Sequence, residues 1–433
     1  MDLLTINDKD GEYPPSFYAA TAEVPPVRPN ATGDIKCDVC VVGGGFSGLS
    51  TALHLAERGY DVVLLEAHRI GFGASGRNGG QVGTGQRRDQ DDLERMVGKD
   101  HARQLWDISR QAQQLVRNLC NDPLVDTPYH RGIIHAAHKQ AHVKPEQDYA
   151  RKLASEYGHE NIQPLDRDEL RALVNSEAYY GGSLDLDAGH VHPLRLALGI
   201  ARKAEAAGAR IFENTRVAHV STDGGNRIET ADAAITAKYL VMACNGYLGR
   251  LQSEVASHVM PINSYVVATE PMAPAQQESL IAHNYAVADT KFVVNYFRFS
   301  EDHRLIFGGT ESYGYRFPND IPAAVRKPMT AIFPQLADIR IDYGWGGTLG
   351  ITMNRMPDFR RLSSTALSIS GYSGHGVAMA TLGGQIAADA IAGQAERFDV
   401  MANVPARPFP GGAALRWPLL FLAMSWYALR DRL

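Results

Sequence analysis

The stretch VVGGGFSGLS, residues 41–50, decides the fold of this 433-residue chain. Its three glycines, Gly43, Gly45 and Gly48, have the G-x-G-x-x-G spacing. An apolar run from Asp38 precedes them and a helical pattern follows, so the sequence predicts a strand, a tight turn and a helix. Such a turn lets the backbone approach a pyrophosphate at the positive end of the helix. The stretch therefore predicts a dinucleotide-binding site.

A second predicted strand, residues 61–65, follows the helix and ends at Glu66. Gly59, between the two, is the predicted C-terminal cap of the helix. An acidic residue about 20 positions after the first glycine is placed to accept hydrogen bonds from the ribose hydroxyls of a dinucleotide. A carboxylate at that place also disfavours a 2′-phosphate, so NADP is not expected.

The loop that follows, residues 67–83 with the sequence AHRIGFGASGRNGGQVG, favours FAD over NAD. A simple NAD domain would proceed directly to another helix and strand. A long glycine-rich loop can instead lie beneath a second phosphate and an extended ring system. Gly79 and Gly80 would leave room for a planar ring, because glycine has no side chain.

Two later segments are predicted to complete the walls of the cofactor site. Residues 238–249, KYLVMACNGYLG, form a buried strand that ends in a turn near the adenosine. Residues 368–391 give a strand, the glycine turn GYSGHG and a helix with apolar residues at helical spacing. A helix that begins beside Gly374 and Gly376 would stabilise the negative charge of a reduced flavin.

The predicted fold is α/β, with a Rossmann-like FAD-binding domain assembled from three segments and an α+β substrate domain built on a β-sheet. The segments between the cofactor walls carry an amphipathic pattern over residues 100–120 and alternating strands such as TKFVVNYFRFS. The predicted domains are residues 34–90, 190–255 and 345–400 for FAD, residues 91–189 and 256–344 for the substrate, and residues 401–433 for a C-terminal tail and helix.

Composition and charge exclude several classes of function. The chain is 45% hydrophobic with a formal net charge of −5, so no nucleic-acid partner is expected. The basic pairs at residues 87–88 and 360–361 are interpreted as solvated surface. Cys37 and Cys40 form a C-x-x-C, but they lie in the predicted first strand and are interpreted as buried packing residues rather than a redox or metal site.

Targeting signals are also not expected. The N-terminal residues lack a basic segment followed by an apolar one, so a cytoplasmic location is predicted. The longest apolar run, residues 417–429, is shorter than the roughly 20 residues that a membrane-spanning helix needs. It is interpreted as a packed C-terminal helix, and a membrane-surface helix remains the less favoured alternative.

Taken in order, the motifs resemble the D-amino-acid oxidase/sarcosine oxidase superfamily of flavin amine oxidases. They are VVGGGFSGLS, LLEAHRIGFGASGRNGGQ, AGHVHP, LVMACNGYLG, WGGTLGITMNRMPDF and GYSGHGVAMATLGGQ. Within the superfamily, the GFGASGRNGGQ loop and the C-terminal tail are similar to those of the bacterial gamma-glutamylputrescine oxidases. The resemblance implies FAD as cofactor, lined by Gly43, Gly45, Phe46, Ser47, Gly48, Glu66, Ala67, Ser75, Arg77, Asn78, Gly79, Gly80, Gln81, Val217, Ala243, Gly246, Gly374, His375 and Gly376.

Two departures from the family pattern bear on the chemistry. Sarcosine oxidase relatives attach the flavin through a cysteine at a place where this chain has Gly350, Ile351 and Thr352, so non-covalent FAD is expected. Those relatives also place a lysine beside the flavin to speed oxygen reduction. Here valine occupies that position, near Val293, and Lys291 is predicted to substitute from the same strand face.

The resemblance implies oxidation of a primary amine, gamma-glutamylputrescine, to an aldehyde, ammonia and hydrogen peroxide, with oxygen as the expected acceptor. His375 is predicted to contact the flavin, with proton transfer as an alternative; His190 and His192 are interpreted as structural. The predicted substrate residues are Tyr265, Tyr296, Arg298, which would pair with a carboxylate, and Trp345. The alternatives are another amine or an N-methyl amino acid as substrate, and a dehydrogenase that transfers electrons to a quinone. No metal site is predicted, and the oligomeric state is left open.

Overall fold

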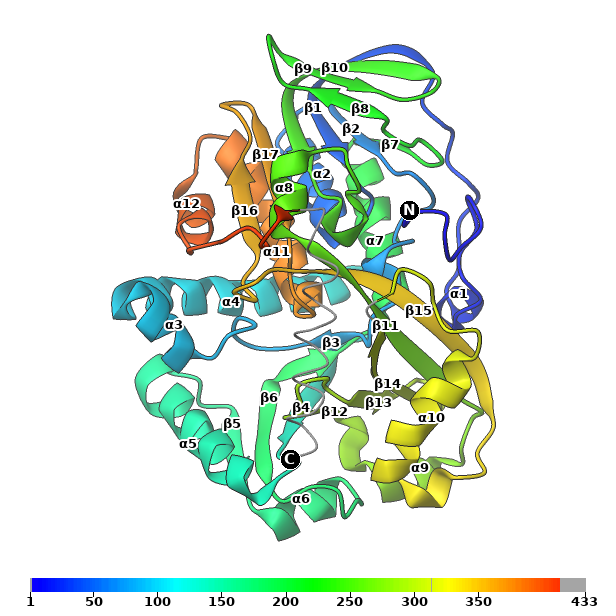
Figure 1. Ribbon diagram of the computed structural model, residues 1–433, viewed down its shortest axis with the longest axis vertical. Coiled ribbons are helices and arrows are strands. Elements are labelled where there is room, and N and C mark those ends of the chain that lie inside the picture. Colours follow the sequence, from blue (N-terminus) through cyan, green and yellow to red (C-terminus); the bar gives the residue numbers. More distant parts are fainter. Residues whose placement is uncertain (1, 313, 413–433) are drawn as a thin grey trace.

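The computed structural model describes residues 2–312 and 314–412, and it has a mixed α/β fold built on two β-sheets. Figure 1 shows the two sheets at opposite ends of the molecule, with the long helix α4 crossing between them. The expected fold class is confirmed by solved structures with the same architecture. The predicted C-terminal helix, residues 417–429, lies outside the described residues.

The first sheet is centred on β1 (Gly33–Val42), the strand that leads into the glycine turn. β1 pairs in parallel with β2 (Val62–Leu65) on one side and with β10 (Ala233–Met242) on the other. The central strands are almost wholly buried, as expected of a parallel sheet covered on both faces. Its other strands are β7 (Arg210–Phe212), β8 (His219–Ser221), β9 (Asn226–Glu229), β16 (Asp358–Arg361) and β17 (Ala366–Ser370).

The second sheet has the strand order β15-β11-β14-β13-β12-β4-β6-β3, with β5 paired to β6. Its pairs are antiparallel except for β12 with β4. The strands are β3 (Gln81–Val82), β4 (His130–Ala136), β5 (Ile162–Leu165), β6 (Gly182–His190), β11 (Met260–Thr269), β12 (Ala286–Asp289), β13 (Tyr296–Phe299), β14 (Leu305–Ser312) and β15 (Ile341–Ile351).

Helices cover both sheets (Figure 1). α2, α7 and α11 share one hydrophobic core with the central strands of the first sheet, and α10 shares another with the second sheet. The helices are α1 (Phe17–Thr21), α2 (Phe46–Ala56), α3 (Gln90–Val97), α4 (Lys99–Cys120), α5 (Gln140–Tyr157), α6 (Arg167–Leu173), α7 (Pro193–Ala206), α8 (Ser253–His258), α9 (Pro274–Leu280), α10 (Ile321–Ile332), α11 (Gly376–Ile391) and α12 (Glu396–Ala402).

Several local predictions are confirmed. The amphipathic pattern over residues 100–120 forms α4, and its apolar stripe, including Leu105 and Ala112, is buried. α7 begins at Pro193, the last residue of the AGHVHP segment. Cys37 and Cys40 are buried in β1 with free thiols. No helix in the described part of the chain is long and apolar enough to cross a membrane.

The predicted domain boundaries stay a prediction, because strands of both sheets occur in the segments assigned to FAD. β3, at residues 81–82, pairs with β6 in the second sheet. β15, at residues 341–351, pairs with β11 in the same sheet. The two sheets therefore meet around these segments, and this is where the cavity of the molecule lies.

Candidate active site

A cavity of about 1430 Å³ lies between the two sheets. Its walls come from the glycine turn after β1, the loop after β2, the ends of β10 and β17, and the strands of the second sheet. Sites for drug-sized ligands are about 300–1,000 Å³. The cavity is therefore large enough to hold a dinucleotide together with a second, smaller molecule.

One end of the cavity is marked by Glu66, which follows β2. The backbone amide of Gly44 donates to Glu66 Oε2 at 2.6 Å, and that of His68 donates to Glu66 Oε1 at 2.9 Å. Burial raises the pKa of the Glu66 carboxyl. Each carboxylate oxygen keeps a further lone pair, so the group can still accept from a hydroxyl of a ligand while the amides hold it in place.

The glycine turn brings three parts of the backbone into close contact. A Cβ atom on Gly48 would lie 1.8 Å from the carbonyl oxygen of Gly43. Gly43 has φ +111°, and a Cβ there would lie 2.7 Å from the carbonyl oxygen of Ala243. Only glycine fits at either position, so these residues press α2 and β10 against the turn.

The helices α2 and α11 both begin at the cavity wall. Neither N-cap residue, Gly45 or His375, caps its helix with a side-chain hydrogen bond. Ser75 Oγ accepts from the amide of Phe46 at 2.9 Å, which ties the loop after β2 to the start of α2. First-turn amides and the helix dipole favour anions, so the cavity presents two places for negative charge.

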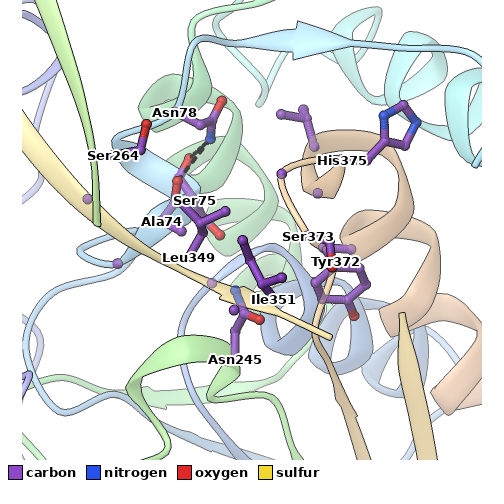
Figure 2. Close-up of a pocket in the computed structure, with 18 of the residues that line it drawn as sticks. Ala74, Ser75, Asn78, Asn245, Ser264, Leu349, Ile351, Tyr372, Ser373 and His375 are labelled. Carbon is purple, nitrogen blue, oxygen red and sulfur yellow. Dashed lines mark hydrogen bonds between the residues drawn. The ribbon is translucent and has the colours of Figure 1, made fainter. Parts of the chain in front are cut away.

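Figure 2 shows how these pieces surround the cavity. Ala74, Ser75 and Asn78 lie on one side, Tyr372, Ser373 and His375 lie on the other, and Leu349 and Ile351 lie between them. Asn78 Nδ2 donates to the carbonyl oxygens of Ala74 and Ser75, both at 3.0 Å. The loop after β2 is thus folded back on itself and held rigid against β15.

Gly79 and Gly80 also let protein groups approach the loop after β2. A Cβ on Gly79 would lie 2.6 Å from the ring of Tyr296, and one on Gly80 would lie 2.2 Å from the carbonyl oxygen of Val191. Gly79 lines the cavity, and the room that these glycines would leave for a planar ring stays a prediction.

Most of the residues predicted to line FAD are brought together at this cavity. Gly48, Gly80 and Gly246 do not line it and instead pack closely against backbone behind the wall. Their roles, like those of the residues in contact with the cavity, stay predictions. The predicted residues that line the cavity are Gly43, Gly45, Phe46, Ser47, Glu66, Ala67, Ser75, Arg77, Asn78, Gly79, Gln81, Val217, Ala243, Gly374, His375 and Gly376.

The prediction missed other wall residues, including Gly44, Asn245, Leu349 and Tyr372. Gly44 lies inside the quoted motif, and Asn245 has a positive φ of 45° in the turn after β10. The Asn-Gly pair at residues 245–246, after a buried strand, was the signal available in the sequence, because both residue types readily adopt turn conformations with positive φ. Tyr372 is held by a hydrogen bond of 2.7 Å between its hydroxyl and that of Ser47.

His375 lies at the N-terminus of α11 with its ring in the cavity wall. Its Nε2 is 3.0 Å from the carbonyl oxygen of Gly85, so Nε2 carries the proton and donates it. Burial, together with the nearby charges of Arg87 and His135, lowers the pKa of His375 to about 4. The ring is therefore neutral at pH 7, with Nδ1 as an acceptor.

Of the predicted substrate residues, only Tyr296 lines the cavity. Arg298 does not: it is buried, and it donates to the carbonyl oxygens of Gly79, Val191 and Phe299 and to the hydroxyl of Tyr18. Through the hydrogen bond to Gly79, the guanidinium joins β13 to the loop after β2. It is therefore not placed to bind a substrate carboxylate.

The two other aromatic residues also lie away from the cavity. Tyr265 packs edge-on against Phe317, with ring centroids 5.6 Å apart, in the core of the second sheet. Trp345 is buried and donates from Nε1 to the carbonyl oxygen of Arg77 at 2.9 Å. Tyr265 and Trp345 are therefore packing residues in this structure and are not part of the cavity wall.

Lys291 lines the cavity, but the strand predicted to carry it is shorter than expected. β13 begins at Tyr296, and residues 291–293 form a bend whose start is fixed by a hydrogen bond from the Lys291 amide to Asp289 Oδ1 at 3.2 Å. The strand-face argument for Lys291 is therefore wrong. Its position at the cavity wall comes from the bend instead.

The interpretation of residues 87–88 as solvated surface is wrong for the first of them. Arg88 forms an outward ion pair with Asp92 at 2.9 Å, whereas Arg87 lines the cavity. The cavity is also lined by Asp89, Glu146 and Glu311, and none of these was predicted. By contrast, the pair at residues 360–361 is surface-facing and engaged in ion pairs.

The donor and acceptor groups of the cavity fit FAD. A carboxylate at the end of β2 suits a ribose, a close-approach glycine turn at a helix start suits a pyrophosphate, and a second helix start suits the anionic part of a reduced ring. When bound, FAD would be held by the turn after β1, by Glu66 and by the segment at the start of α11.

Comparison with solved structures shows the same fold. The crystal structure of glycine oxidase from Geobacillus kaustophilus matches with a TM-score of 0.70 at 20% identity, covering 83% of this chain and 95% of that one. L-Proline dehydrogenase from P. horikoshii matches with a TM-score of 0.69 at 20% identity, covering 90% and 99%.

Comparison of sequences identifies the family. Gamma-glutamylputrescine oxidoreductase of Escherichia coli (strain K12) is 41% identical over 425 residues, which is 98% of this chain and 99% of that protein. A probable oxidoreductase, OrdL, of Rhizobium meliloti (strain 1021) is 40% identical over 96% of this chain and 97% of its own length. Residues 38–390 match the family described as DAO, FAD dependent oxidoreductase. The chain is therefore an FAD-dependent oxidoreductase of the DAO family.

Proposed function

We propose that this enzyme oxidises the primary amine of gamma-glutamylputrescine and releases an aldehyde, ammonia and hydrogen peroxide. The observation that carries the proposal is the 41% identity, over nearly the whole of both chains, to a gamma-glutamylputrescine oxidoreductase. In the balanced reaction, R–CH2–NH2, oxygen and water give R–CHO, ammonia and hydrogen peroxide. Bound FAD supplies the acceptor for the hydride that leaves the carbon bearing the amine.

The part of the cavity beside the predicted ring has a floor suited to an uncharged amine. Ser264 on β11 pairs with Glu311 on β14 and with Gly347 on β15, so the three positions form one row across the sheet. All three line the cavity, as does Tyr296. Burial raises the pKa of Glu311, and a carboxylate in this row can accept a hydrogen bond from the amine and orient it.

Neutral His375 supports the same chemistry from the opposite wall. A charged imidazolium would repel a substrate ammonium, and a neutral ring does not. The amine loses its proton more easily in a desolvated site, because burial disfavours the charged form. We propose that the chain orients the amine and excludes water, and that a dedicated protein base is not needed.

We further propose that oxygen is the acceptor and that Lys291 speeds its reduction. A lysine ammonium at the cavity wall would stabilise the negative charge that forms when oxygen accepts an electron. Lys291→Met should then slow the reoxidation of the reduced enzyme by air about 10-fold or more. It should leave the rate of anaerobic reduction by substrate within about 2-fold of wild type.

Product analysis tests the proposed function. Purified enzyme and gamma-glutamylputrescine should consume oxygen and release ammonia and hydrogen peroxide in equal amounts, with a matching yield of aldehyde. A panel of other primary amines and N-methyl amino acids serves as comparison. Faster turnover of an N-methyl amino acid would overturn the proposed substrate. Turnover with a quinone and none with oxygen would overturn the proposed acceptor.

A further inference from the structure

The cavity extends beyond the predicted ring into a second region lined by ionisable side chains. Arg87 follows β3, Asp89 is the N-cap residue of α3, His135 lies on β4 and Glu146 lies on α5. We call the region lined by these four residues the charged chamber. Gly83 and His375 lie where it joins the rest of the cavity, since a Cβ on Gly83 would be 2.6 Å from the His375 ring.

The charged groups of the chamber are not neutralised by contacts with one another. Among residues 2–312 and 314–412, no hydrogen bond or ion pair holds the guanidinium of Arg87 or the carboxylate of Glu146. Asp89 makes no side-chain cap hydrogen bond to its own helix. Arg87 and Glu146 are half-buried and Asp89 is more exposed, and all three line the cavity. A cation and two carboxylates without protein partners can pair with a ligand that carries both signs.

The positive side chain and the negative side chains of the charged chamber are close enough to affect one another's pKa. Burial lowers the pKa of Arg87, and the negative charges of Asp89 and Glu311 oppose that shift. Burial raises the pKa of both Asp89 and Glu146, and the negative charge of Asp89 further raises the pKa of Glu146. A ligand ammonium between the two carboxylates would relieve their repulsion, and a ligand carboxylate would pair with the fork of Arg87.

An ammonium and a carboxylate on neighbouring atoms form the head group of an α-amino acid. We propose that the charged chamber binds the α-amino acid group at the end of the substrate distant from the reacting amine. Arg87 binds its carboxylate, and Asp89 with Glu146 binds its ammonium. This inference rests on the proposed function, because it takes the substrate to be an amine joined through a linker to a free amino acid.

The chamber would then decide which amines are oxidised. A diamine without the head group would leave Arg87 unpaired and would meet its positive charge. An acylated diamine without charges would displace water from all three groups and leave them unpaired, which disfavours binding. The enzyme should therefore discriminate against unmodified diamines by the missing head group.

Three matched ligands separate the two halves of the proposed site. They are the butylamides of γ-linked glutamate, of glutarate and of 4-aminobutanoate, which carry both charges, the carboxylate alone and the ammonium alone. None carries the reacting amine, so binding is followed by the change in flavin absorbance without turnover. Arg87→Gln should weaken the first two ligands about 10- to 100-fold and leave the third within about 2-fold.

The double variant Asp89→Asn/Glu146→Gln should give the opposite pattern. It should weaken the γ-glutamyl and 4-aminobutanoyl ligands about 10- to 100-fold and leave the glutaryl ligand unchanged or bound more tightly. Arg88→Gln and Asp91→Asn are the controls: they remove the same charges nearby, where Arg88 pairs with Asp92 and Asp91 pairs with Lys152. Both should bind all three ligands as wild type does.

Equal weakening of all three ligands by Arg87→Gln, or no weakening of any, would overturn the assignment of the chamber. A bound flavin with the wild-type visible spectrum shows that each variant is folded. Failure of the proposed function is distinguishable: wild type would bind the γ-glutamyl ligand with the predicted pattern and yet fail to oxidise gamma-glutamylputrescine.

Discussion

Gly48→Ala is the substitution whose consequence follows most directly from the structure. The added Cβ would lie 1.8 Å from the Gly43 carbonyl oxygen, and because that oxygen is backbone, the start of α2 must move by roughly 1 Å to relieve the contact. Overpacking of this kind costs about 1–3 kcal/mol. Bound FAD requires the turn and α2 in their present positions, so the cost should appear as about 5- to 150-fold weaker FAD binding.

The assay is titration of apoprotein with FAD, followed by quenching of flavin fluorescence. Gly314→Ala is the control, since Gly314 does not line the cavity and a Cβ there would have no heavy atom within 4 Å. It should bind FAD within about 3-fold of wild type. The reasoning is refuted if Gly48→Ala binds FAD as tightly as wild type, or if both variants lose affinity equally.

Three further predictions follow from single residues. Arg298→Met should lower the free energy of unfolding of the holoenzyme by about 2–5 kcal/mol in urea denaturation, because it removes hydrogen-bond donors from buried carbonyl oxygens. Unchanged stability together with a raised KM would instead show that Arg298 binds the substrate. Acid precipitation of the protein should leave the flavin in the supernatant, because the flavin is expected to be bound non-covalently. No Cys occupies residues 350–352, and burial raises the pKa of the Cys244 thiol to about 12, which keeps it protonated and unreactive. A yellow pellet would show that the flavin is attached covalently. The pKa of His375 falls from about 6.5 unfolded to about 4 folded, so its contribution to stability is present above pH 6.5 and is lost as the pH falls toward 4. Between pH 7 and pH 5 wild type should therefore lose up to about 2 kcal/mol more stability than His375→Gln in urea denaturation; equal losses would show that the ring is not desolvated.

The local chemistry of the first βαβ unit made much of the FAD site predictable from sequence. Gly43, Gly48 and Glu66 are determined by backbone approach and by one carboxylate at a strand end, and both constraints act within a short stretch of chain. The same is true of the turn before α11. In these places the residue type at a given spacing is sufficient to predict the local geometry.

The second sheet could not be predicted in the same way, because its contacts join residues far apart in the chain. Arg298 looked available for a substrate, but its acceptors come from the loop after β2 and from the segment before α7. Arg87 looked like surface in a basic pair, yet the fold turns it into the cavity while its neighbour Arg88 faces Asp92. Lys291 was placed by an assumed strand, and the bend before β13 changes which residues share a face.

The most direct test of the central claim is an anaerobic titration of the purified yellow protein with gamma-glutamylputrescine. We expect full bleaching of the flavin absorbance, and recovery of the colour with release of hydrogen peroxide when air is admitted. A flavin that stays oxidised with gamma-glutamylputrescine but is bleached by another amine would overturn the proposed substrate.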